Sequence, residues 1–149
     1  PGFAERAFAA YREAFDPEEG LGGLDEPQGM VAVNAVAAET DEAAARRRAP
    51  AEATFRRMQR GELGDQTPTV EEAVEELGGA PEPTPATLDD DEWPRSISGS
   101  PETISGLLEQ LADRVGVDEV MIQHTVPDRD DALESHALLA EAMDLDGRK

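Results

Sequence analysis

The sequence predicts an α/β fold with parallel strands, and this prediction depends mainly on residues 93–143. A short apolar run at residues 96–98 leads into a glycine turn, which a helical pattern follows. A second short apolar run, at residues 120–122, comes next, and another helical pattern closes the segment. Strands that alternate with helices in this way are typical of parallel α/β proteins.

The helix after residues 96–98 has clear start and stop signals. Ser100 is a good N-cap because its hydroxyl can accept from the free amides of the first turn. Pro101 suits the first helical position, where no N–H is needed, and Glu102 lies at the positive end of the helix dipole. Gly116 is a typical C-terminal stop. Apolar residues at helical spacing predict the buried face of this helix: Ile104, Leu107, Leu108, Leu111 and Val115.

Acidic residues dominate the composition. The chain has 149 residues, with 34 acidic and 13 basic side chains and a net charge of −21, and Lys149 is its only lysine. We interpret this halophilic pattern as adaptation to a high-salt cytoplasm, because salt screens the self-repulsion of the folded chain. Neither a basic surface for nucleic acid nor an apolar run of the roughly 18 residues of a membrane span is visible. The absence of cysteine excludes disulfides and thiolate metal sites.

The remaining patterns divide the chain into three parts. Residues 1–61 are expected to form a helix with an aromatic core stripe, a strand at 30–38 buried on both faces, and a second helix that Pro50 should kink or split. Residues 62–93 form an acidic connector, in which a capping box at Thr69 and Glu72 opens a short helix. Residues 94–149 carry the strand–helix–strand–helix pattern. With no signal peptide visible, we expect a cytoplasmic protein.

The chain resembles the C-terminal portion of the luciferase-like flavin-dependent monooxygenases. Three short motifs carry the resemblance, in this order: Gly99-Ser100-Pro101-Glu102, Gly116-Val117-Asp118-Glu119, and Ser135 with Leu138-Leu139-Ala140. It implies a partial (β/α)8 TIM-type barrel made of about the last three βα units, with residues 1–149 as one domain. A complete barrel needs about 200 residues or more, so the earlier strands are expected to lie outside this chain.

Two features are candidates for chemistry. The free amides at Gly99 and Ser100 open a helix and could bind a cofactor phosphate, although the same turn serves equally well as a plain cap. His124 follows the predicted strand at residues 120–122, where barrel enzymes carry active-site residues. We take it as the candidate catalytic residue, a neutral donor or general base, with an ordinary polar loop residue as the alternative. Because parallel strands end at the same edge of a sheet, these residues are expected to lie at one end.

Three other polar features are interpreted as structural. Asn34 interrupts the apolar run at residues 30–38, and we expect neighbouring groups to satisfy its amide, with a position inside a barrel as the alternative. The run Arg46-Arg47-Arg48 is expected to pair with nearby acids on a solvated face. The acidic cluster at residues 89–92 lacks the spacing of metal ligands, so no metal site is predicted.

The resemblance implies an oxidoreductase or monooxygenase that uses reduced FMN, or alternatively a deazaflavin, to act on a small organic substrate. The expected partners are that substrate, the flavin and further copies of the chain, but neither nucleic acid nor a membrane. Much of the family's flavin site lies outside the resemblance, so the chain is expected to be a fragment of such an enzyme. Two alternatives remain open, namely a non-catalytic truncated half-barrel that pairs with another subunit and a non-functional gene fragment.

We predict that folding depends on salt. At about 1 M salt the Debye length is roughly 3 Å, against roughly 30 Å at 0.01 M, so dilution restores the repulsion that a net charge of −21 creates. The chain should therefore fold cooperatively at molar salt and lose much of its helical circular dichroism when salt is diluted. A helical signal that stays unchanged down to millimolar salt would contradict the high-salt interpretation.

Overall fold

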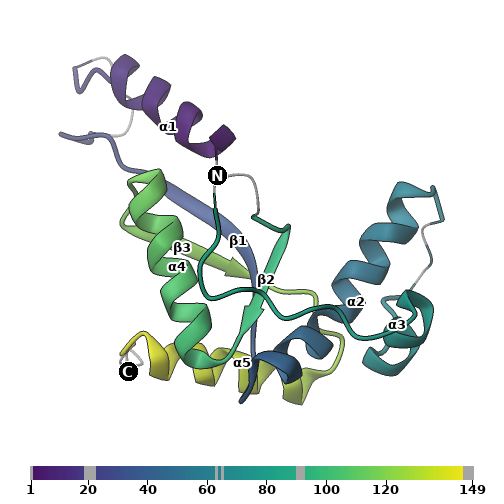
Figure 1. Ribbon diagram of the computed structural model, residues 1–149. Helices are drawn as coiled ribbons and strands as arrows, with labels where there is room; N and C mark the ends of the chain where they lie inside the picture. Colours follow the sequence, from purple (N-terminus) through teal and green to yellow (C-terminus); the bar gives the residue numbers. More distant parts are fainter. Residues whose placement is uncertain (1, 19–22, 63, 65, 90–92, 146–149) are drawn as a thin grey trace.

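A parallel three-stranded sheet lies at the centre of the computed structural model (Figure 1). The structure describes residues 2–18, 23–62, 64, 66–89 and 93–145. The elements within these residues are, in chain order, α1 (Gly2–Ala14), β1 (Met30–Ala37), α2 (Asp41–Gln59), α3 (Val70–Leu77), β2 (Ser96–Gly99), α4 (Pro101–Val115), β3 (Glu119–Gln123) and α5 (Arg129–Ala142).

The strands lie in the order β2-β1-β3, so the first strand of the chain is in the middle of the sheet. Consecutive βα units of a barrel would place their strands side by side in chain order. The prediction of a partial (β/α)8 TIM-type barrel made of the last three units is therefore wrong, although the α/β class and the parallel strands fit. The apolar pattern of each strand is compatible with pairing to either of the other two strands, so the sequence pattern did not indicate the order of the strands in the sheet.

The length of β1 makes this order possible. Residues 30–34 of β1 pair with β3, and residues 34–37 pair with β2. Asn34 is the residue that both pairings share, opposite Ser96 on one side and Gln123 on the other. Strand β2 thus begins at the level where β3 ends, and β1 offers each of them about half of its length.

Helices α2 and α4 cover opposite faces of the sheet. The chain moves one way from β1 to β2 and then back past β1 to β3, and right-handed crossovers of opposite direction lie on opposite faces. Successive residues of a strand also point to opposite faces. Accordingly, Ala35 packs with Leu107 of α4, whereas Asn34 lines a cavity with Arg48 of α2. In Figure 1, α4 runs along one side of the strands, and α2 and α3 extend on the other.

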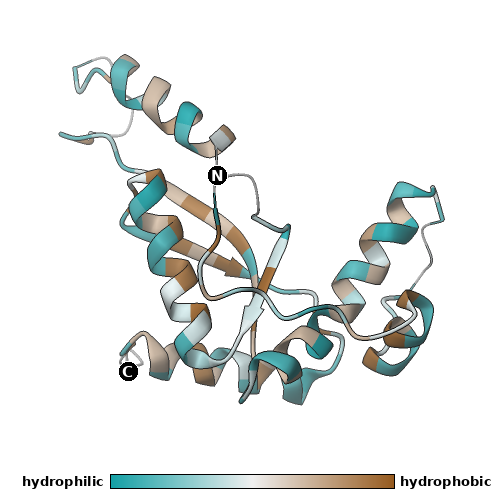
Figure 2. Cartoon of the chain, in the orientation of Figure 1, coloured by the Kyte–Doolittle hydropathy of each residue, from teal (hydrophilic) through white to brown (hydrophobic). Residues whose placement is uncertain are grey.

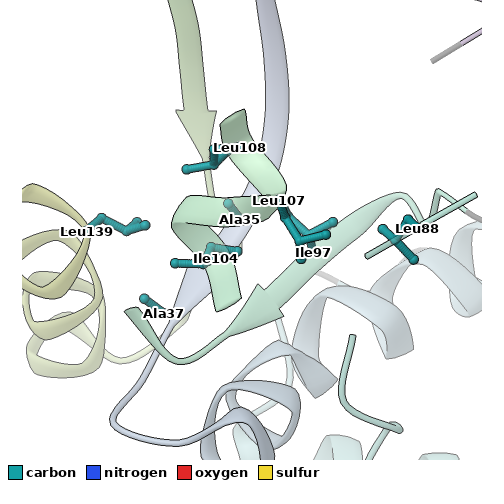
Figure 3. Packing of buried hydrophobic residues seen from close by; sticks show 8 residues of the cluster. All are labelled: Ala35, Ala37, Leu88, Ile97, Ile104, Leu107, Leu108 and Leu139. Atoms are coloured by element: carbon teal, nitrogen blue, oxygen red, sulfur yellow. The ribbon is translucent and has the colours of Figure 1, made fainter. Parts of the chain in front are cut away.

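The main hydrophobic core lies between the sheet and α4, and Leu139 of α5 adds to it (Figure 3). All five apolar residues that the sequence placed on the inner face of residues 104–115 are buried, which confirms that prediction. Figure 2 shows hydrophobic residues along the strands and hydrophilic residues over much of α2. The buried members of this core are Ala35, Ala37, Leu88, Ile97, Ile104, Leu107, Leu108 and Leu139.

Only the C-terminal half of β1 is buried on both faces. Residues 35–38 are buried, but Met30 is 47% exposed, and Met121, which lies opposite Ala32, is 43% exposed. The prediction for residues 30–38 is therefore correct only from Ala35 onward. On the α2 side of the sheet, this leaves an apolar surface formed by Met30, Ala32 and Met121.

Helix α1 lies at the edge of the molecule and contributes no buried residue (Figure 1). Phe3 is 81% exposed and Tyr11 is 38% exposed, and no residue of α1 is buried, so the prediction of an aromatic core stripe is wrong. Phe8 packs beside Val117, and the guanidinium of Arg12 donates to the carbonyl of Val115. These few contacts attach α1 to the end of α4.

Helix α2 continues from Asp41 to Gln59 although it contains Pro50. The helix is therefore not split at Pro50, which is itself buried, and a kink there stays a prediction. None of the helices in the described part of the chain has both the length and the apolar character that crossing a membrane requires.

Candidate functional site

A cavity of about 400 Å³ lies where β1 changes partners. Asn34 forms its floor on the sheet, Ser96 lies where β2 begins, and Thr125 follows the end of β3. Successive turns of α2 contribute side chains from one face of that helix. The cavity is lined by Asn34, Arg48, Ala51, Glu52, Phe55, Pro94, Arg95, Ser96 and Thr125.

Arg48 is a largely desolvated cation in this wall. Its Nη1 donates to the carbonyl of Ser96 at 3.0 Å, and its Nη2 donates to the carbonyl of Glu82 at 2.8 Å. Burial lowers the pKa of Arg48, and the charge of nearby Glu52 partly opposes that shift. Both direct partners are neutral carbonyls, and no carboxylate of the described residues forms an ion pair with Arg48.

Arg95 and Phe55 form a cation–π pair at the same cavity. The guanidinium carbon of Arg95 lies 4.0 Å from the centre of the Phe55 ring, which is a cation–π geometry. Arg95, like Arg48, has no ion pair with a carboxylate in the part of the chain that the structure describes. The amide nitrogen of Asn34 donates to the backbone carbonyl of Arg95 at 3.5 Å. The expectation that neighbours satisfy Asn34 is thus met by one long hydrogen bond.

Two buried polar atoms of cavity-lining residues have no hydrogen-bond partner among the described residues. They are Nε of Arg48 and Oγ of Ser96. A buried donor or acceptor without a partner costs about 1–3 kcal/mol, so native proteins rarely leave one without a reason. The cavity therefore combines apolar walls, two cations and an incomplete hydrogen-bond network.

A second cavity, of about 470 Å³, differs in its electrostatics. It is lined by Arg46 and Arg47, whose charges are already paired. Arg47 lies 2.8 Å from Asp131 and 2.7 Å from Glu134, and Arg46 lies 3.5 Å from Glu71. The predicted ion pairs are confirmed for Arg46 and Arg47, but the predicted solvated face holds only for Arg46, because the side chain of Arg47 is 12% exposed. The ion pairing does not extend to Arg48, which the helix turns toward the other cavity.

The turn at Gly99 and Ser100 is already in contact with an anion of the chain itself. The amide of Ser100 donates to Oδ1 of Asp41 at 2.7 Å, and the hydroxyl of Thr103 donates to Oδ2. The hydrogen bond from the Ser100 amide lowers the pKa of Asp41, so its carboxylate is charged at neutral pH. A phosphate at this turn would have to displace Asp41, and the turn as it stands does not fit one. Cofactor binding by Gly99 and Ser100 remains a prediction.

His124 follows β3 and lies against a second histidine. The rings of His124 and His136 of α5 are 4.6 Å apart between centroids and meet edge to face at 65°. Nδ1 of His124 accepts from the amide of Val126 at 3.4 Å. Burial, and secondly the charge of His136, lowers the pKa of His124, which favours the neutral imidazole near pH 7. A neutral imidazole can act as a base, so the chemical role predicted for His124 is compatible with its surroundings.

The two candidate features do not form one site. Ser100 and His124 both follow the carboxyl ends of parallel strands, but β2 and β3 lie on opposite sides of β1. Gly99 lies opposite Ala37, whereas the residue before His124 lies opposite Asn34. His124 is instead next to Thr125, which lines the 400 Å³ cavity.

Sequence reasoning missed the arginines of this cavity. Asn34 stood out as the polar residue inside an apolar strand, and it was the one available signal of a lined space. Arg48 belonged to a basic run, and nothing marked Arg95 or Phe55 as site residues, because only the fold brings them together. Residues 90–92 of the acidic cluster lie outside the described residues. Within the described part, no group of three or more His, Cys, Asp or Glu residues is placed to hold a metal.

Comparison with known proteins finds matches among both curated sequences and solved structures. No family model matches the chain. The uncharacterized protein YvbT of Bacillus subtilis (strain 168) is 27% identical over 135 residues, which cover 91% of this chain and 38% of that protein. The crystal structure of apo-MsnO8 matches with a TM-score of 0.82 and 34% identity, over 98% of this chain and 42% of that one. The chain therefore shares its fold with part of MsnO8, and it spans less than half of the length of both proteins.

We predict that the pKa of His124 lies below 6.5 in the folded chain. The folded state disfavours the imidazolium, so the unfolded state binds the proton more readily. The free energy of unfolding should therefore fall as the pH drops below about 6.5. NMR titration in molar salt, which screens the general negative charge, measures this pKa. In His136→Gln it should rise but stay below 6.5, because burial remains. A wild-type pKa above 6.5, or no response to His136→Gln, would contradict this assignment.

Proposed function

We propose that the chain is part of a luciferase-like flavin-dependent oxidoreductase or monooxygenase that acts on a small organic substrate. The observation that carries the proposal is the place of the three resemblance motifs in the fold. Gly99-Ser100-Pro101-Glu102 joins β2 to α4, and Gly116-Val117-Asp118-Glu119 joins α4 to β3. Ser135, from the third motif, is fully buried, and its hydroxyl accepts from the amide of Ala37 at 2.9 Å. The first two motifs thus lie at junctions between strands and helices, and Ser135 of the third joins α5 to β1.

In this proposal the cofactor is reduced FMN or a deazaflavin, which supplies the electron-transfer chemistry. The described residues do not form a complete flavin site. The amide of Ser100 already donates a hydrogen bond to Asp41, and His124 lies on the other side of β1. The contribution of this chain is His124 as a neutral acid–base group, next in sequence to Thr125 of the 400 Å³ cavity. The rest of the site belongs to other parts of a longer protein, which fits the partial coverage of YvbT and MsnO8.

The surface formed by Met30, Ala32 and Met121 belongs to the same proposal. These residues lie on the half of the sheet that α2 leaves open. In the complete enzyme, other parts of the protein or a second copy of the chain would cover them, as expected for an apolar sheet surface with a free edge.

A chimera tests the proposal. The C-terminal segment of a flavin-dependent monooxygenase of the luciferase-like family would be replaced by residues 1–149. We predict that the chimera binds reduced flavin and consumes oxygen, and that His124→Ala lowers its turnover by about 100-fold, a typical loss for an acid–base group. His136→Ala in the same chimera is the control for the neighbouring ring. A folded chimera without flavin affinity would contradict the proposal.

A further inference from the structure

We infer that the cavity lined by Arg48 and Arg95 binds an organic anion, with a carboxylate or phosphate on a planar or apolar body. The inference concerns the surroundings of these two arginines and does not depend on the flavin chemistry proposed above. A cavity of about 400 Å³ is within the range of small-molecule sites in proteins.

The distribution of charge provides the first argument. In a chain with 34 acidic residues and a net charge of −21, carboxylates are available in excess for every arginine. Arg46, Arg47, Arg56, Arg57 and Arg60 all form ion pairs with them. Two arginines of one cavity, Arg48 and Arg95, have no such pair with the described carboxylates. Glu52 lines the same cavity, but its carboxylate pairs with Arg56 at 2.8 Å.

The surroundings of Arg48 provide the second argument. Two backbone carbonyls orient its guanidinium but do not neutralise its charge. Its Nε and the Oγ of Ser96 are buried without partners in the described structure. An anionic oxygen beside Arg48 would supply the missing charge and acceptor together, and guanidinium groups bind carboxylates and phosphates through such paired contacts.

The remaining walls indicate what carries the anion. The guanidinium carbon of Arg95 lies 4.0 Å from the centre of the Phe55 ring, and Ala51 and Pro94 add apolar surface. A flat, largely apolar body packs well against such a wall. The side chains of Asn34 and Thr125 lie at the same cavity as further polar groups. The general field of the chain repels anions, so binding here must come from local contacts.

Binding of 4-fluorobenzoate to the full chain in molar salt, followed by fluorine NMR, tests the inference. We expect a Kd of about 1 mM or below. Neutral 4-fluorobenzamide should bind at least about tenfold more weakly, because it lacks the charge that the arginines recognise. Arg95→Gln and Arg48→Gln should each weaken fluorobenzoate binding about tenfold. Arg46→Gln, an exposed and paired arginine of the same helix, should leave it unchanged.

A second arm separates the two sources of the anion. If FMN binds more tightly than riboflavin, and Arg95→Gln removes the difference, then the cavity takes a phosphate. If fluorobenzoate binds but FMN and riboflavin bind with equal affinity, then the cavity takes a carboxylate. Arg95 is exposed and makes no side-chain hydrogen bond in the described structure, so its variant stays informative even if Arg48→Gln fails to fold. No binding of either anion, or binding that is equal in Arg95→Gln, would overturn the inference, whatever the chimera shows.

Discussion

The pairing of β1 with two partners is the constraint on which the rest of the structure depends. Strand β1 holds β3 along residues 30–34 and β2 along residues 34–37, so the sheet exists only because β1 lies between the other two. This order sends the two crossovers in opposite directions and places α2 and α4 on opposite faces. Where the partners change, at Asn34, the sheet leaves room for the cavity that Arg48 and Arg95 line.

Local structure was largely predictable from the sequence, because short-range chemistry determines it. Ser100 caps α4 by accepting from the amide of Thr103, Thr69 and Glu72 form the predicted capping box, and Gly116 ends α4 in the left-handed conformation. Helix α2 is the exception, since the protein tolerates Pro50 in its interior. Packing against the sheet evidently outweighs the hydrogen bond that this proline cannot make.

Long-range arrangement was not predictable in the same way. The sequence of residues 119–123 does not indicate whether this strand pairs with β1 or with β2, and the resemblance suggested strands side by side in the order of the chain. For the same reason, the sequence could not predict which candidate residues lie together. Ser100 and His124 follow strands as expected, but the strand order separates them, and Asp41 reaches the amide of Ser100 from another helix. Arg48 and Arg95 are 47 positions apart in the sequence, and only the fold brings them to the same cavity.

Engineered cysteine pairs test the strand order most directly, because the chain has no cysteine of its own. Ala32→Cys with Met121→Cys joins Cα partners of β1 and β3 on an exposed face, within about the distance that a disulfide or a short bis-thiol reagent spans. Ser96→Cys with Gln123→Cys lies across β1, roughly 10 Å apart, and is the matched control. The β2-β1-β3 order predicts cross-linking of the first pair alone in molar salt. Cross-linking of the second pair in place of the first would contradict it.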